Sequence, residues 1–434
     1  MKAAVLTLGC KVNQYESDVI MQRLVDEGFK IVDFDDLADV YIVNTCSVTA
    51  VSDKKSRQAL RRAKKQNPEA VVIAAGCYPQ IAKQELASME EIDICVGTEN
   101  KYDLVKLAKE ELKNRRKIID IPDNRDYIPY EIDFITETYS HTRAHIKIED
   151  GCNNFCSYCI IPYTRGRVRS KLISDAVSEF YGLAEKGYKE IVLTGIEVSS
   201  YGHDTGEQLI DLLEGLNTAA RNYPDLRVRL SSLEPRIVTE EFTEKLSALE
   251  RICPQYHLSL QSGSDAVLKR MNRKYSVSDY YRALIMLREA REEAMFTTDV
   301  IVGFPGETGE EFLETCSFVR EAEFLKVHVF PYSVRPGTKA AEMDGQITKE
   351  QKEKRVHFLD NVSKSIRAEI IEKQKGKTFD VLFESEIGTD MYEGFSENYI
   401  PIRAASKTDI RGKVLKVRIS KSEDDFCYGV IETV

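Results

Sequence analysis

Three cysteines lie close together between Glu149 and Cys159, in a stretch that reads EDGCNNFCSYC. Cys152, Cys156 and Cys159 form a C-x3-C-x2-C motif there. Three thiolates on one short loop can hold a single metal centre. A structural zinc site would need a fourth ligand, and the nearest downstream histidine or cysteine, His203, is more than forty residues away. The motif therefore predicts an iron–sulfur cluster with an open position, and structural zinc is the alternative.

The motif follows a short apolar segment that opens a regular alternation of strands and helices. Strands are predicted at residues 144–148, 190–193, 228–230, 257–260, 298–302 and 327–330. Helices are predicted between them, near residues 174–186, 208–217, 240–249, 279–291 and 310–321. Six strands are fewer than the eight of a complete barrel, so this region predicts a partial (βα)6 barrel. The cysteine motif then lies on the face where such barrels keep their active sites.

An earlier alternation, over residues 1 to about 113, predicts a doubly wound parallel sheet and places the protein in the α/β class. Strands are predicted at residues 3–8, 40–43, 71–74 and 92–96, and helices at residues 13–28, 52–65, 80–88 and 102–113. The first helix is expected to begin at Asn13, with Glu16 completing a capping box.

Three further cysteines each follow a predicted strand of this sheet. Cys10, Cys46 and Cys77 are more than thirty residues apart in sequence, but each lies at the carboxyl end of a strand. Ligands bind outside these ends in open parallel sheets, so the three thiols are predicted to meet there and hold a second cluster. The alternative is that they are ordinary small residues of a core.

The remaining segments complete the domain organisation. Residues 115–140 predict a linker, and Thr348 caps a long helix that is expected to end at Gly376. The last 58 residues contain short alternating segments and predict a small β-barrel. Three domains are therefore expected, at residues 1–136, 137–374 and 375–434.

The two cysteine sets occur in segments that resemble a known family. The EDGCNNFCSYC loop resembles that of the radical S-adenosylmethionine (SAM) superfamily, and IIPYTRGR at residues 160–167 resembles its methylthiotransferase branch. GCKVNQYES at residues 9–17, NTCSVT at 44–49 and GCYPQ at 76–80 resemble the cysteine motifs of the same branch. The resemblance implies two 4Fe-4S clusters, and it makes six cysteines catalytic metal ligands: Cys10, Cys46, Cys77, Cys152, Cys156 and Cys159.

The resemblance also implies the reaction. The first cluster would cleave SAM to methionine and a 5′-deoxyadenosyl radical, which takes hydrogen from C2 of an adenine in a tRNA anticodon loop. The second cluster would deliver sulfur, and a second SAM would supply the methyl group. KVNQYES at residues 11–17 resembles the branch that acts on threonylcarbamoyladenosine at position 37 of tRNA.

Several alternatives to this reaction stay open. The isopentenyladenosine tRNA branch and the ribosomal-protein branch are rivals within the family. A non-catalytic metal-cluster RNA-binding protein would not cleave SAM. A flavodoxin-like redox carrier is disfavoured, because the sequence has no phosphate-binding glycine loop.

Residues at the ends of the barrel strands are expected to contact SAM. The resemblance implies these SAM-binding residues: Tyr158, Gly195, Glu197, Ser232, Glu234, Gln261 and Val302. Glu197 would accept a hydrogen bond from the methionine amine, and Val302 would lie along the adenine. Polar residues at strand ends are also common turn formers, which is the alternative explanation.

Charge is distributed unevenly along the chain. The formal net charge is -10, which excludes a protein that binds nucleic acid over its whole surface. Local basic patches occur in each expected domain, and the C-terminal barrel resembles the RNA-binding TRAM domain. The expected RNA contacts are Arg57, Arg61, Arg165, Arg167, Lys416 and Arg418. The implied partners are tRNA, an electron donor such as flavodoxin, and a sulfur donor.

Composition is that of a globular protein without membrane segments. Hydrophobic residues make up 42% and charged residues 30%, and no apolar run approaches the length of a membrane span. The apolar N-terminal run at residues 3–8 is too short for a signal peptide, so a cytoplasmic location is expected. The four other cysteines (Cys95, Cys253, Cys316 and Cys427) are predicted to be structural.

Overall fold

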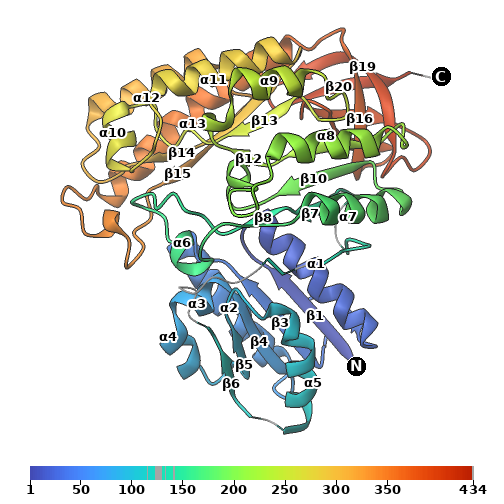
Figure 1. Ribbon diagram of the computed structural model, residues 1–434, viewed down its shortest axis with the longest axis vertical. Helices are drawn as coiled ribbons and strands as arrows, with labels where there is room; N and C mark the ends of the chain where they lie inside the picture. Colours follow the sequence, from blue (N-terminus) through green and yellow to red (C-terminus); the bar gives the residue numbers. More distant parts are fainter. Residues whose placement is uncertain (115, 123–129, 132, 140–141, 433–434) are drawn as a thin grey trace.

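The computed structural model describes residues 1–114, 116–122, 130–131, 133–139 and 142–432 (Figure 1). The N-terminal part contains a parallel sheet, the central part contains parallel strands covered by helices, and the C-terminal part is a closed barrel. The linker predicted at residues 115–140 contains strand β6 (Ile118–Asp120), which extends the N-terminal sheet, so the linker prediction is wrong there. Residues 115, 123–129, 132 and 140 lie outside the described part of the chain. The domain limits expected near residues 136 and 374 stay predictions.

Six parallel strands form the N-terminal sheet, in the order β2-β1-β3-β4-β5-β6. They are β1 (Lys2–Thr7), β2 (Lys30–Ile31), β3 (Val40–Thr45), β4 (Val71–Gly76), β5 (Ile94–Val96) and β6 (Ile118–Asp120). The helices are α1 (Lys11–Asp26), α2 (Ala50–Gln66), α3 (Cys77–Ile81), α4 (Lys83–Ser88) and α5 (Leu104–Asn114), with the 3-10 turn η1 (Lys101–Asp103). Side chains of α1 and α5 pack on one face of the sheet, and those of α2 and α4 pack on the other. The predicted doubly wound sheet is confirmed.

Helix α1 is buried on nearly every side because it lies between the sheet and the central strands (Figure 1). Ile20 and Leu24 belong to the core of the sheet, whereas Tyr15 and Val19 belong to the core of the central region. The Tyr15 hydroxyl donates to the carbonyl oxygen of Asp133 at 2.8 Å. The N-terminal end of α1 is therefore held firmly against the rest of the protein.

The helix begins at Lys11, so the predicted N-cap at Asn13 is wrong. Cys10 is the N-cap residue, and Asn13 lies buried in the first turn. The Asn13 amide donates to the carbonyl oxygens of Leu8 at 2.7 Å and Thr45 at 2.9 Å. Asparagine is common at helix N-caps, but here its side chain hydrogen-bonds the backbone of two different loops and connects them.

Asp18 gives α1 a pH-dependent contribution to stability. Its carboxylate is buried, one of its oxygens has no hydrogen-bond partner among the residues that the structure describes, and burial raises its pKa to about 7. Because the folded-state pKa exceeds the unfolded value, the folded protein loses stability as pH rises through the window from about 4 to 7. The free energy of unfolding should therefore fall by about 2–3 kcal/mol between pH 5 and pH 8 because of Asp18, and an Asp18→Asn variant should not show this fall.

Unfolding by urea at pH 5 and pH 8 would measure this difference. Asp26→Asn, which alters an exposed carboxylate on the same helix, is the matched control and should show the pH profile of the unaltered protein. Parallel pH profiles for the unaltered protein and the Asp18→Asn variant would contradict the prediction.

The central region contains two groups of parallel strands, β11-β10-β7 and β12-β13-β14-β15. The strands are β7 (Ala144–Lys147), β10 (Glu190–Thr194), β11 (Arg227–Leu230), β12 (Ser232–Leu233), β13 (Gln255–Leu258), β14 (Met295–Val302) and β15 (Lys326–Pro331). A single residue, Ser231, separates β11 from β12. The groups therefore follow one another as six successive strand positions, and the predicted partial (βα)6 barrel is confirmed.

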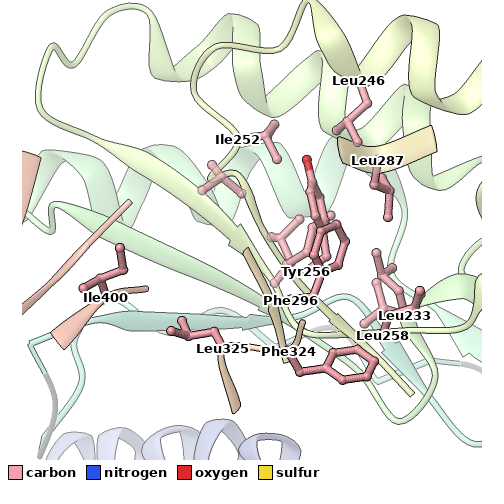
Figure 2. Close-up of a cluster of buried hydrophobic side chains, with 14 of the residues drawn as sticks. Leu233, Leu246, Ile252, Tyr256, Leu258, Leu287, Phe296, Phe324, Leu325 and Ile400 are labelled. Carbon is pink, nitrogen blue, oxygen red and sulfur yellow. The ribbon is translucent and has the colours of Figure 1, made fainter. Parts of the chain in front are cut away.

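Helices cover the outside of this barrel. They are α6 (Ile161–Thr164), α7 (Ile173–Glu185), α8 (Leu209–Ala220), α9 (Glu240–Ser247), α10 (Asp265–Arg270), α11 (Val277–Ala290), α12 (Gly309–Ala322) and α13 (Lys349–Glu372). The short elements are β8 (Glu149–Asp150), β9 (Arg169–Ser170), η2 (Val198–Ser200), η3 (Pro235–Ile237) and η4 (Lys339–Ala341). Figure 2 shows Tyr256 and Phe296 packed against Leu246 and Leu287 between strands and helices. The outer faces of the strands are thus apolar, which leaves their inner faces free for polar residues.

The C-terminal part is a closed barrel of five strands in the order β16-β17-β18-β20-β19, as predicted. They are β16 (Thr378–Gly388), β17 (Met391–Ser396), β18 (Pro401–Ala405), β19 (Val414–Glu423) and β20 (Phe426–Ile431). Val417 and Ile419 point into this barrel, whereas Lys416 and Arg418 are exposed. In the described part of the chain, every helix is too short or too polar to cross a bilayer.

Candidate active site

The loop of Cys152, Cys156 and Cys159 is closed by its own backbone. Strands β8 and β9 pair antiparallel at its two ends, and Cys152 N–H donates to the carbonyl oxygen of Gly166 at 3.1 Å. Cys159 N–H donates to the carbonyl oxygen of Cys156 at 3.0 Å. These bonds fold three cysteines into one compact loop at the end of strand β7.

An arginine and two carboxylates lie beside this loop. Arg273 Nη1 donates to Cys156 Sγ at 3.3 Å, and its Nη2 lies 3.4 Å from Glu234 Oε1. Glu197 Oε2 accepts a weak hydrogen bond from Asn154 Nδ2 at 3.5 Å. Burial, reinforced by the charge of Glu234, raises the pKa of Glu197 to about 7. The structure thus brings two of the expected SAM residues, Glu197 and Glu234, next to the cysteine loop.

Gly195 allows a close approach between two strand ends. A Cβ on Gly195 would lie 2.6 Å from Glu149 Oε2, and the same oxygen accepts from the Glu197 backbone N–H at 2.8 Å. Ser232 is half-buried in β12, directly after the break in the strand. Gly195 therefore acts through its lack of a side chain, which lets Glu149 hold Glu197 in place.

A cavity of about 250 Å³ opens beside Cys159. Tyr158 and Gln261, both expected SAM residues, line it. Ile301 lines it too, whereas Val302 is fully buried in the hydrophobic core. The Val302 side chain therefore faces the core, because neighbouring residues of a strand face opposite sides, and its contact with the adenine stays a prediction.

The second set of cysteines meets where strands β1, β3 and β4 end. Gly9 has a φ of +107°, and a Cβ on it would lie 2.6 Å from Cys46 Cβ. The backbone N–H of Tyr78 donates to Thr45 Oγ1 at 3.2 Å, which joins the loops of Cys46 and Cys77. Burial raises the pKa of Cys46 to about 11, and the nearby Cys77 thiolate adds to this shift. These loops therefore converge as the strand ends predicted.

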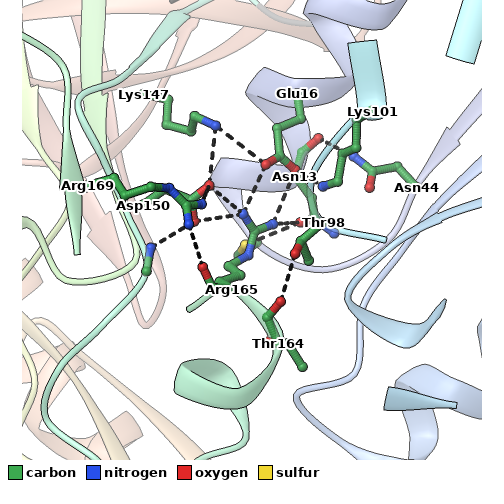
Figure 3. Close-up of polar contacts among 12 residues, drawn as sticks. Asn13, Glu16, Asn44, Thr98, Lys101, Lys147, Asp150, Thr164, Arg165 and Arg169 are labelled. Carbon is green, nitrogen blue, oxygen red and sulfur yellow. Dashed lines mark hydrogen bonds and ion pairs between the residues drawn. The ribbon is translucent and has the colours of Figure 1, made fainter. Parts of the chain in front are cut away.

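A buried network of charges connects the sheet to the cysteine loop (Figure 3). Its members are Glu16, Lys101, Lys147, Asp150, Arg165 and Arg169. Arg165 Nη1 lies 2.9 Å from Glu16 Oε1 and 3.0 Å from Asp150 Oδ1. Although burial acts in the opposite direction, the cations Arg165, Lys101 and Lys147 lower the pKa of Glu16 to about 2.

The Arg165 network has more positive than negative charge. Four cations face two ionised carboxylates, and the Arg165 guanidinium acts electrostatically on both Cys10 and Cys77. A cluster held by three thiolates is itself negatively charged, so the surplus would offset its charge. These residues therefore fit an anionic iron–sulfur cluster.

The spacing of the thiols also distinguishes a site for an iron–sulfur cluster from a site for a single zinc ion. Of the described residues, only His257, Asp299 and His328 bring three potential ligand atoms within 4.8 Å of one another. Neither cysteine set does, although three sulfurs around one zinc would lie less than about 4 Å apart, given Zn–S bonds of about 2.3 Å. A four-iron cube spreads its thiolates further apart, so the zinc alternative is disfavoured.

The expected RNA contacts divide into exposed and buried residues. Arg61, Arg167, Lys416 and Arg418 are exposed and Arg57 is partly exposed. Arg165 is fully buried and its guanidinium is occupied by Glu16, Asp150 and Asn13, so the expected RNA contact of Arg165 is corrected.

Four polar residues of the site were not predicted from the sequence. Asp299 lines the cavity, His257 and His328 cluster with Asp299, and Arg273 contacts Cys156. His257 Nε2 lies 3.3 Å from Asp299 Oδ2, and Asp299 lines the cavity beside Cys159. Polar residues at alternate positions of otherwise apolar strands were the available signal, since these are the positions that face a barrel interior.

Comparisons with known proteins agree with this geometry. The Radical SAM superfamily profile matches residues 146–319, and the profile of the uncharacterized protein family UPF0004 matches residues 2–97. The chain is 39% identical over 421 residues to the threonylcarbamoyladenosine tRNA methylthiotransferase MtaB of Bacillus subtilis, covering 96% of this chain and 93% of that protein.

Two further matches are more distant. The chain is 32% identical over 443 residues to the tRNA-2-methylthio-N(6)-dimethylallyladenosine synthase of Carboxydothermus hydrogenoformans, covering 98% of each. A similar fold is found in the radical SAM methyltransferase TsrM of Kitasatospora setae, with a TM-score of 0.58, 16% identity, and coverage of 89% of this chain and 81% of that one.

The partial barrel with three cysteines at the end of its first strand defines a radical SAM enzyme. The chain belongs to the MtaB family of threonylcarbamoyladenosine tRNA methylthiotransferases. It is a transferase of the class that uses SAM and two 4Fe-4S clusters.

Proposed function

We propose that this enzyme converts N6-threonylcarbamoyladenosine at position 37 of tRNA to its 2-methylthio derivative. The observation that supports the proposal is that the cavity beside Cys159 is also lined by the segment that follows Cys46. Val48 and Thr49, just after Cys46, line the same cavity as Tyr158 and Cys159. A base held there would be accessible from both sides, as a reaction with two metal centres requires.

Each cysteine set has its own role in this proposal. Cys152, Cys156 and Cys159 hold the cluster that binds SAM, and Cys10, Cys46 and Cys77 hold the cluster that carries sulfur. When bound, these cofactors supply the reductive cleavage of SAM, the radical that activates C2 of the adenine, and the sulfur and methyl groups that are added.

The side chains around the first loop bind and orient SAM. Glu197 accepts from the methionine amine, and Glu234 and Ser232 face the ribose hydroxyls. Arg273, which donates to Cys156 Sγ, orients that sulfur. The largely apolar lining of the cavity beside Cys159 excludes water from a reactive radical.

The exposed arginines and lysines contact the phosphates of the anticodon stem-loop. These residues are Arg57, Arg61, Arg167, Lys416 and Arg418. An anticodon-loop base is already single-stranded, which lowers the cost of placing it in the cavity. An electron donor such as flavodoxin and a separate sulfur donor complete the reaction, and tRNA as substrate implies a cytoplasmic location.

Mass spectrometry of tRNA nucleosides tests the proposed function. The full chain, reconstituted anaerobically with iron and sulfide, is incubated with SAM, a reductant and tRNA that carries threonylcarbamoyladenosine. The 2-methylthio derivative should form at a level comparable to the input tRNA. Modification of isopentenyladenosine tRNA or of a ribosomal protein instead would overturn the substrate, and the absence of SAM cleavage would favour a non-catalytic RNA-binding protein.

A further inference from the structure

A second cavity, of about 310 Å³, lies beside Cys10. Three distant parts of the chain line it: Cys10 and Lys11 at the start of α1, Arg143 just before β7, and Glu384 in β16. It therefore lies where the N-terminal sheet, the central barrel and the C-terminal barrel meet. Apart from Cys10, none of these lining residues has a role in the reaction described above.

Two donors in this cavity lack partners. The Lys11 ammonium is exposed and makes no hydrogen bond or ion pair within the described ranges of the chain. Arg143 is mostly buried, and its Nη2 has no hydrogen-bond partner among the described residues. An ammonium without a partner beside a guanidinium with one free nitrogen indicates a site for an anion that the protein itself does not supply.

The nearby carboxylates are already occupied. Glu190 pairs with Arg143 at 3.2 Å, with Arg227 at 2.6 Å and with Arg229 at 2.6 Å. Glu384 pairs with Arg143 at 2.5 Å. Positive charge is thus in excess around Lys11, and a carboxylate from outside would be stabilised there.

We propose that Lys11 and Arg143 bind the carboxylate of the threonyl group of the substrate. This inference rests on the proposed function and names the residues that would distinguish its substrate. A threonylcarbamoyl group carries one carboxylate, whereas a dimethylallyl group carries none. A cation that has no partner in the protein can therefore distinguish the two substrates, since it would remain unpaired with the apolar substituent.

The chemistry of the substituent suits the position of Lys11. The distal N–H of the urea can donate to N1 of the adenine, which directs the threonyl group along the edge that carries C2. Cys10 belongs to the cysteine set proposed to deliver sulfur to C2, and Lys11 is the next residue in the chain. Lys11 also lies close enough to His328 to act on it electrostatically, and His328 clusters with Asp299, which lines the cavity proposed to hold the base. A substituent that extends from the base toward Cys10 would therefore bring its carboxylate to Lys11.

Phosphate is the other anion that these residues could bind, because the tRNA carries both phosphates and the threonyl carboxylate. A pair of anticodon stem-loop oligonucleotides separates the two sources. One carries threonylcarbamoyladenosine at position 37 and the other carries its carboxamide, which has the same shape and no charge. Equilibrium binding of both is measured with the reconstituted full chain, and the variants are Lys11→Met, Lys11→Arg and the exposed control Lys349→Met.

The unaltered protein should bind the acid about 10- to 100-fold more tightly than the amide. Lys11→Met should reduce this preference to a few-fold at most, Lys11→Arg should retain most of it, and Lys349→Met should leave it unchanged. Equal weakening of acid and amide by Lys11→Met would assign Lys11 to a phosphate and overturn the proposal, as would an unchanged preference.

The nucleoside assay separates these outcomes from failure of the proposed function. If the unaltered protein prefers the acid in a Lys11-dependent manner but forms no 2-methylthio product, the carboxylate site is supported and the proposed reaction is wrong. If product forms while the preference is independent of Lys11, the reaction is supported and the carboxylate site is wrong.

Discussion

Alanine at Cys152, Cys156 and Cys159 is expected to abolish 5′-deoxyadenosine formation and to lower the iron content from about eight to about four atoms per chain. These cysteines share a loop closed by the pairing of β8 and β9, next to the cavity that is proposed to hold SAM. Without the thiolates no cluster is held there, and SAM is neither bound nor reduced. Iron analysis and chromatography of the reaction mixture measure both effects.

Alanine at Cys10, Cys46 and Cys77 is the matched comparison, because it removes the same number of thiols. The same loss of iron is expected, but 5′-deoxyadenosine should still form while the methylthio product disappears. Cys316→Ala removes a buried thiol outside both sets and should affect neither iron content nor product. Surviving SAM cleavage in the first variant, or its loss in both triple variants, would contradict the division of roles.

The fold could be predicted closely because its signals are local. Apolar runs marked the strands, and the alternation of strands with helices fixed the parallel arrangement. Cys10, Cys46 and Cys77 could be placed together from sequence because parallel strands bring their carboxyl ends to one edge. The glycine before Cys10 carried a further signal, since a side chain there would collide with Cys46.

The contacts between the two halves of the site could not be predicted, because they depend on how α1 lies against the barrel. Glu16 and Arg165 are 149 residues apart, and nothing in either local pattern indicates that they pair. Arg165 therefore resembled an exposed basic residue in sequence. Likewise, whether Ile301 or Val302 lines the cavity depends on which face of β14 points inward, and only the assembled barrel determines this.

Replacing Arg165 with methionine is expected to destabilise the folded protein by about 3 kcal/mol. The substitution fills a similar volume, but it removes the guanidinium that bonds Glu16, Asp150 and Asn13. Both carboxylates stay buried, and each loses the cation that joins it to the other. A chain of this length should show a lower thermal midpoint by about 3 °C if it unfolds in one transition.

Arg167→Met is the control for this prediction, because it removes the same charge from an exposed residue that lies two positions after Arg165. Among the described residues, the Arg167 side chain makes only a stacking contact with Phe155, at 4.7 Å to the ring centroid, so its loss should cost less than about 1 kcal/mol. Arg165→Lys keeps the charge but cannot bond two carboxylates with a planar fork, so an intermediate cost is expected. Thermal unfolding of the three variants before cluster reconstitution measures the order of their thermal midpoints directly. Equal midpoints for Arg165→Met and Arg167→Met would show that the buried network does not hold α1 against the barrel.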